Sequence, residues 1–129
     1  MKKILVIMLS MFLFSCVNKP LSETEMLTGS WEYISKENEP VEAQLDFNSD
    51  MSYKYTANTG KDNFVQTGMW KLTEHGEIEI LLERVVKNDK QVRVLNVNHF
   101  INIVSLTRGH MLLRFGKDKE YRQEFHKID

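Results

Sequence analysis

The chain has 129 residues, of which 42% are hydrophobic and 27% charged, with 17 lysines and arginines against 18 aspartates and glutamates. This length allows one domain with one modest core. The near-neutral charge disfavours nucleic acid or an anionic membrane face as a partner, because both attract a basic surface. The single cysteine, Cys16, excludes an intramolecular disulfide.

The N-terminal segment combines a short basic part with a short apolar part. Lys2 and Lys3 precede an apolar run over residues 4–14, which is typical of a secretory signal and shorter than the roughly 20 residues of a transmembrane helix. The run ends in Leu13-Phe14-Ser15-Cys16, which resembles the lipobox of bacterial lipoproteins: an aliphatic residue, a variable one, a small one and the cysteine. The resemblance implies a signal peptide over residues 1–15.

That resemblance also implies cleavage before Cys16, diacylglycerol on its thiol and a further fatty acid such as palmitate on the new N-terminus. Several acyl chains anchor a protein stably. We therefore expect a lipoprotein of the cell envelope, anchored to the outer membrane on its periplasmic side or at the cell surface. Two alternatives stay open: a secreted protein whose leader carries a stray cysteine, and an uncleaved anchor.

The predicted mature chain starts at Cys16. Loss of Lys2 and Lys3 leaves 15 basic residues against 18 acidic ones, a formal charge of −3. The segment from Val17 to Glu25 is polar and shows no periodicity, which predicts a flexible tether. We therefore divide the chain into the leader, a lipidated cysteine and tether over residues 16–26, and a folded domain over residues 27–129.

The folded domain is expected to be all-β. Short runs of β-branched, aromatic and alternating residues are separated by Gly, Asn and Asp clusters, and no stretch has a convincing helical period. Nine strands are predicted, at residues 30–35, 42–47, 51–57, 64–72, 77–86, 91–96, 100–107, 110–115 and 120–126. With short connections throughout, an antiparallel up-and-down β-barrel of eight to nine strands is the simplest arrangement, since closure removes exposed edges.

An ordered series of motifs is similar to that of a known family. Leu27-Thr28-Gly29-Ser30-Trp31 matches the Leu-x-Gly-x-Trp opening of lipocalin-like domains, and Gly68-Met69-Trp70-Lys71-Leu72 resembles their Gly-x-Trp strand. Residues 45–50, 103–115 and 120–125 resemble their second strand and last hairpins. The chain thus resembles the small lipocalin-like lipoproteins of Bacteroidetes over roughly residues 26–127.

The resemblance implies a calycin-type barrel with a closed floor. In that pattern Gly29 permits close approach, and Trp31 caps the closed end against an arginine from the last strands, with Arg122 the first candidate and Arg114 the second. It also implies a small apolar or amphipathic ligand at the barrel mouth. The family's longer members carry a C-terminal helix for which this chain has no room.

Four aromatic residues are candidates for facing a ligand: Phe47, Tyr53, Tyr55 and Trp70. They could stack on a sugar or a lipid, but in a barrel this narrow the favoured interpretation is that they fill the core. The expected inward side chains are nearly all large and converge on the barrel axis. The sequence therefore predicts at most a shallow mouth pocket, near the lower end of the roughly 300–1,000 Å³ range of ligand sites.

The sequence gives little support for a catalytic site or a metal site. The histidines, His75, His99, His110 and His126, are scattered without metal-site spacing, and no Gly-x-Ser-x-Gly turn presents a serine nucleophile. Glu77, Glu79 and Glu83 share one face of a predicted strand. They could line a cavity for a cationic ligand, but such a row more often forms a solvated outer face. We expect a non-enzymatic protein without metal or cofactor.

Two functions remain open on these grounds. One is binding of a small apolar or amphipathic molecule at the barrel mouth, and the other is a protein–protein interaction or inhibitor-like role for a filled barrel in the envelope. An apolar lumen would favour the first function, and a packed interior with an exposed apolar patch the second. We expect a monomer in either case.

Overall fold

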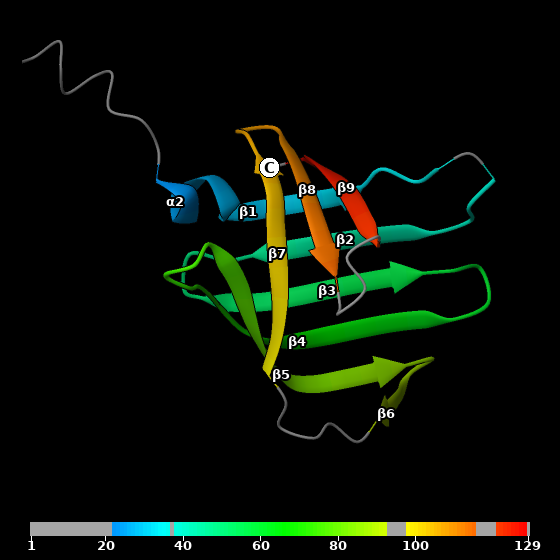
Figure 1. Ribbon diagram of the computed structural model, residues 1–129. Helices are drawn as coiled ribbons and strands as arrows, with labels where there is room; N and C mark the ends of the chain where they lie inside the picture. Colours follow the sequence, from blue (N-terminus) through cyan, green and yellow to red (C-terminus); the bar gives the residue numbers. More distant parts are fainter. Residues whose placement is uncertain (1–21, 37, 93–97, 116–120, 129) are drawn as a thin grey trace, which may run out of the picture.

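The computed structural model describes residues 22–36, 38–92, 98–115 and 121–128, so the predicted leader, Cys16 and most of the tether lie outside the described residues. Over the described residues the protein is almost entirely β (Figure 1). Its elements are α2 (Glu23–Leu27), β1 (Gly29–Tyr33), β2 (Glu42–Phe47), β3 (Ser52–Asn58), β4 (Asn63–Leu72), β5 (Glu77–Lys87), β6 (Lys90–Val92), β7 (Asn98–Leu106), β8 (His110–Phe115) and β9 (Arg122–Lys127).

The strands form a closed antiparallel barrel. Consecutive strands pair from β1 to β5, β5 pairs with β7, β7 to β9 pair in order, and β9 returns to β1. This is an eight-stranded up-and-down barrel of lipocalin-like type, which confirms the predicted fold class. The ninth strand, β6, is an extra strand that pairs with the end of β5 outside the closed barrel. Residues 93–96 of the strand predicted at 91–96 lie outside the described residues.

A bulge in β5 explains why the extra strand exists. The first half of β5, residues 77–81, pairs with β7, whereas residues 85–87 pair with β6. Between the two halves, the register with β4 shifts at Thr67 and Gly68, as happens when a bulge bends a strand. A side chain on Gly68 would collide with the backbone carbonyl of Leu81, so only glycine allows the strands to approach this closely.

The short helix α2 corrects the expectation of a structureless tether up to residue 26. The Ser22 hydroxyl accepts a hydrogen bond from the Glu25 backbone N–H at 3.2 Å and donates one to the Glu25 carboxylate at 3.1 Å. This Ser-x-x-Glu arrangement resembles a capping box, a signal that was legible in the sequence. No helix among the described residues has the length and apolar character needed to cross a membrane.

The floor of the barrel is its end beside α2. There β1 begins, β2 ends and β3 begins (Figure 1). Leu27 of α2 is fully buried in the core. The indole N–H of Trp31 donates to the Leu27 carbonyl at 2.9 Å, and that of Trp70 donates to the Asn48 carbonyl at 3.0 Å. Because each buried indole has its hydrogen bond, both rings can close the floor without an unsatisfied donor.

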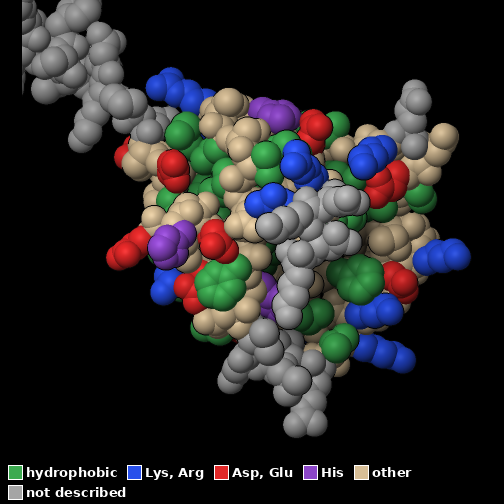
Figure 2. All heavy atoms as spheres, viewed as in Figure 1, with side chains coloured by type: hydrophobic (Ala, Val, Ile, Leu, Met, Phe, Trp, Pro, Cys, Tyr) green, Lys and Arg blue, Asp and Glu red, His purple; other side chains and the backbone are tan. Residues whose placement is uncertain are grey.

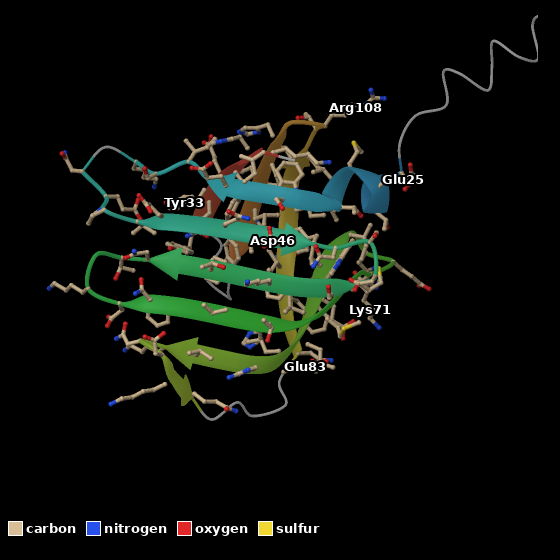
Figure 3. All side chains as sticks on the ribbon, turned by 180° about the vertical axis from the view of Figure 1, so that it is seen from behind. Glu25, Tyr33, Asp46, Lys71, Glu83 and Arg108 are labelled. Atoms are coloured by element: carbon tan, nitrogen blue, oxygen red, sulfur yellow. The ribbon has the colours of Figure 1, made fainter. Side chains whose placement is uncertain are left out.

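The mouth is the opposite end, where the loops after β1, β3 and β5 lie. Figure 3 labels Glu25 of α2 and Tyr33 at the end of β1, and these two residues lie at opposite ends of the molecule. Acidic and basic side chains are interspersed over the face seen in Figure 2. The barrel therefore has a closed end that contains α2 and a second end that the helix does not cover.

Candidate functional site

A cavity of about 670 Å³ occupies the half of the barrel away from α2. The predicted shallow pocket near the lower end of the range of ligand sites was therefore wrong. The walls of the observed cavity come from β2, β3, β4, β5, β7, β8 and the start of β9.

Apolar side chains line much of the cavity. They come from β2, β5, β7 and β8: Leu45, Ile80, Leu82, Ile101 and Phe115. Their strand positions alternate with outward residues, because successive side chains of a strand point to opposite faces. Such a lining with a few polar groups is the usual composition of a small-molecule site.

Polar side chains line the rest of the cavity. Tyr53 and Tyr55 come from β3, and Gln66 lies directly across from Tyr55 on β4. Tyr121 and Gln123 contribute from the start of β9, where the Gln123 amide donates to the Tyr121 hydroxyl at 3.1 Å. His99 of β7 also lines this space. The cavity thus presents hydroxyl and amide groups beside an apolar surface.

The chain has four tyrosines: Tyr33 and Tyr121 lie toward the mouth, Tyr55 lies in the middle of β3, and Tyr53 lies nearer the floor, directly opposite Phe47. Burial raises the pKa of Tyr53 well above its usual value, and the neighbouring Tyr55 adds to that shift. Burial also raises the pKa of Tyr55, with a smaller contribution from Tyr121. Burial, together with a hydrogen bond to Glu39 of 3.1 Å, raises the pKa of Tyr33 to about 12. At neutral pH these phenols are therefore protonated hydrogen-bond donors.

The four residues predicted to face a ligand divide into two pairs. Tyr53 and Tyr55 line the cavity. Phe47 and Trp70 do not, because their rings pack against each other at the floor with centroids 5.2 Å apart, and both are buried. For these two residues the structure agrees with the favoured interpretation, that they fill the core, and not with a place facing a ligand. The strand period placed Trp70 on the same face as Phe64, but it could not say at which end of the barrel Trp70 would lie.

The floor residues also require a correction. Trp31 is fully buried and Gly29 has a φ of 137°, a conformation that favours glycine. The cation over the Trp31 ring is Lys127, whose Nζ lies 5.6 Å from the ring centroid. Arg122 is exposed and lies at the other end of β9, five positions from Lys127.

The period of β9 gives the physical reason for that correction. Lys127 lies opposite Trp31 in the pairing of β9 with β1, and it shares the inward face of Phe125. The side chain of Arg122 lies on the opposite face of β9, and Arg122 pairs with Arg114 of β8. Arg114, the second candidate, therefore also has the parity opposite to the buried Met111 and Leu113.

Several lining residues were not predicted to face the cavity: Gln66, His99, Tyr121 and Gln123. Alternation was the available signal. Gln66 shares its face with Phe64 and Gly68, and Gln123 shares its face with Phe125. These polar residues at inward positions of the strands would have marked the lumen as partly polar.

Glu79, His110 and His126 take part in side-chain pairs. Glu79 pairs with Lys71 at 3.1 Å and accepts from Asn98 at 2.7 Å, while Glu77 contributes to the cavity wall. His110 and His126 form exposed pairs with Glu124 and Glu32. Within the described ranges, no three His, Cys, Asp or Glu residues are grouped as metal ligands would be.

The fold and the cavity together define a closed antiparallel β-barrel with a packed floor and a hollow mouth. Comparison with known proteins adds no family to this description. No protein-family model matches the chain, and no curated protein matches it. The resemblance to lipocalin-like lipoproteins therefore stays a prediction, while the barrel itself is observed.

Proposed function

We propose that this protein is a non-enzymatic, lipid-anchored binding protein of the cell envelope, which takes a small apolar or amphipathic molecule into the mouth of its barrel. The observation that carries the proposal is the cavity of about 670 Å³. Its volume lies within the roughly 300–1,000 Å³ of known ligand pockets, and its lining combines apolar side chains with hydroxyl and amide groups.

The proposed anchor has a consequence for orientation. Cys16 precedes Ser22, the cap of α2, by six residues. A fully extended chain of that length spans at most about 20 Å. Because α2 belongs to the floor end, a lipid on Cys16 would keep the floor near the membrane and direct the mouth away from it. We therefore propose that the ligand enters from the aqueous side of the anchored protein.

The anchor is tested by Cys16→Ser. Cells that produce this variant should contain unprocessed or soluble protein that incorporates no labelled palmitate, because the acylated thiol is required for cleavage and retention. The matched control is Ser15→Ala, which keeps a small residue before the cysteine and should be processed and retained like the wild type. A Cys16→Ser protein that stays membrane-bound at the mature size would contradict the proposed anchor.

The binding function is tested by native mass spectrometry of the protein purified from its own host. The expected spectrum contains a species heavier than the apo barrel by the mass of one small molecule. Gln66→Trp combined with Gln123→Trp fills the cavity wall and should remove that species. A ligand retained in full by the filled barrel would contradict binding in the mouth.

An exposed apolar cluster favours a second candidate function, that of an interaction module for another envelope protein. Met69 and Leu81 lie directly opposite each other on β4 and β5, and both are about 40% exposed, while Phe100 of β7 is 51% exposed. Photo-crosslinking from position 100 in cells should then yield one discrete envelope protein, whereas crosslinking from Lys54, an exposed residue on β3, should not. Equal crosslinking from both positions would remove this candidate.

A further inference from the structure

Polar groups reach the cavity from several strands, and three of them are adjacent. Tyr53 and Tyr55 are neighbours on the inward face of β3, and Gln66 of β4 is the direct cross-strand partner of Tyr55. The apolar lining residues Ile80, Leu82 and Ile101 belong to β5 and β7. A molecule that fills this space therefore meets a contiguous set of hydrogen-bonding groups on β3 and β4, apolar side chains of β5 and β7, and further polar groups on β5, β7 and β9.

The hydroxyl of Tyr53 is the most informative of these groups. Tyr53 is only 5% exposed and lines the cavity, and its hydroxyl makes no hydrogen bond to any described residue. The same holds for the Tyr55 hydroxyl and the Gln66 amide within the described part of the chain. Tyr55 and Gln66 are partly exposed, and none of these three polar groups is among the buried side-chain atoms that lack a partner in the described residues. All three therefore reach the open space of the cavity, where they are available to hydrogen-bond a molecule.

The charge of the wall limits what that partner can be. No lysine or arginine is among the described lining residues, and Glu77 is the only carboxylate there. Against these described residues, an ionised carboxylate or phosphate on the ligand would lose its hydration without gaining a lysine or arginine as counter-ion, which is strongly unfavourable. Tyr53 and Tyr55 are neutral at pH 7, and burial raises the pKa of both further, so these two residues and Gln66 can donate and accept hydrogen bonds without carrying charge.

We propose that the cavity selects an uncharged molecule with a hydroxyl or keto group along one edge of an otherwise apolar body, and that Tyr53, Tyr55 and Gln66 hydrogen-bond that edge. This inference rests on the proposed ligand-binding function and names the chemistry of the ligand. A hydroxyl and a primary amide can each donate and accept, so the wall accommodates either an alcohol or a carbonyl. The apolar side of the cavity holds the body of the molecule.

Three rigid probes with the same ring test the proposal: naphthalene, 2-naphthol and 2-naphthoate, titrated calorimetrically at pH 7. Wild-type protein should bind 2-naphthol about three- to tenfold more tightly than naphthalene, the gain of one net hydrogen bond. It should bind 2-naphthoate at least about tenfold more weakly than 2-naphthol, because the carboxylate is desolvated without a counter-ion.

The variants localise the effect. Tyr53→Phe combined with Tyr55→Phe keeps both rings and should abolish the preference for 2-naphthol, with the affinity for naphthalene unchanged. Tyr33→Phe is the matched control, because the Tyr33 hydroxyl already hydrogen-bonds Glu39 and does not line the cavity. If circular dichroism shows that the double variant is unfolded, Gln66→Leu should reduce the same preference on its own.

Each outcome separates this inference from the function on which it rests. Equal affinity for all three probes, or tightest binding of 2-naphthoate, would overturn the proposed selectivity and leave the binding function intact. A preference for 2-naphthol that survives in the double variant and in Gln66→Leu would overturn the roles of these residues. Absence of binding for every probe would overturn both the selectivity and the proposed function.

Discussion

The two ends of the barrel are built from the same strands but are packed in opposite ways. At the floor, Trp31, Phe47 and Trp70 are at most 2% exposed, and the indoles hydrogen-bond to backbone carbonyls. At the mouth, Tyr55 and Gln66 are only partly buried and line a cavity of about 670 Å³. Tight packing and the space for a ligand therefore lie at different positions along the barrel axis. The floor residues close the barrel, and the residues nearer the mouth leave a cavity.

The largest expected effect is at the floor. Trp31→Ala should lower the free energy of unfolding by about 3–5 kcal/mol, the range for a buried aromatic side chain, since it removes a fully buried ring. At the mouth, Tyr121→Ala should cost less than about 1 kcal/mol, because Tyr121 is 56% exposed. Urea denaturation measures both. Equal losses in the free energy of unfolding for the two variants would contradict the distinction between a packed floor and an open mouth.

The bulge beside the cavity provides the next test. Gly68→Ala should cost about 3 kcal/mol, the upper end of the usual range for overpacking, because the new methyl group meets the rigid Leu81 carbonyl. Gly109→Ala is the matched control, as nothing lies within 4 Å of a side chain there, and it should change stability by less than about 1 kcal/mol. Thermal denaturation of the two variants should separate them clearly, and similar melting temperatures would contradict the observed bulge.

Alkaline solution tests the burial of the tyrosines. An unfolded tyrosine loses its proton near pH 10, whereas the pKa of Tyr33 in the folded barrel is about 12. Because the folded state holds this proton more tightly, its contribution to stability is complete below pH 10 and is lost as the pH rises from 10 to about 12. The urea midpoint should therefore fall over that interval, and Tyr33→Phe should make the fall shallower. An identical fall in the variant would contradict the raised pKa.

The smallest expected effect concerns the cation at the floor. Lys127→Met removes the ammonium over the Trp31 ring and should cost about 0.5–1 kcal/mol, the value of an exposed cation–π contact. Arg122→Met should leave stability unchanged, because Arg122 is exposed and does not reach Trp31. Chemical denaturation at low salt distinguishes the two variants. A larger loss of stability for Arg122→Met than for Lys127→Met would support the contact between Arg122 and Trp31 that the family resemblance implied.

The strand period predicted the barrel well because it acts locally. The alternation of side chains predicted the first and last residues of β2 and β8 as observed. It placed the remaining strands within a few residues of their observed bounds. It could not reveal that β5 pairs with two neighbours, since that depends on the bulge beside Gly68. The Ser22–Glu25 cap is a local signal for the start of α2, but a helix of five residues is too short to show a helical period.

The site was predicted less well because it depends on position along the barrel axis. The alternation of side chains predicts only that Phe47 and Tyr53 both point inward. In the structure Phe47 closes the floor, whereas Tyr53 lines the cavity. The make-up of the cavity wall follows from which side chains meet across strands, such as Tyr55 and Gln66. Such coincidences require the register of the sheet, which turn lengths and bulges set and which the residue pattern does not specify.

The central claim is that the mouth half of the barrel is a binding cavity, and one titration tests it most directly. Wild-type protein, the filled variant with Gln66→Trp and Gln123→Trp, and an outward control with Thr67→Trp and Glu124→Trp would each be titrated with the fluorescent apolar probe N-phenyl-1-naphthylamine. We predict saturable uptake of one probe per barrel by the wild type and the control, and loss of uptake by the folded filled variant. Unchanged uptake by the filled variant, or no saturable uptake by the wild type, would contradict the claim.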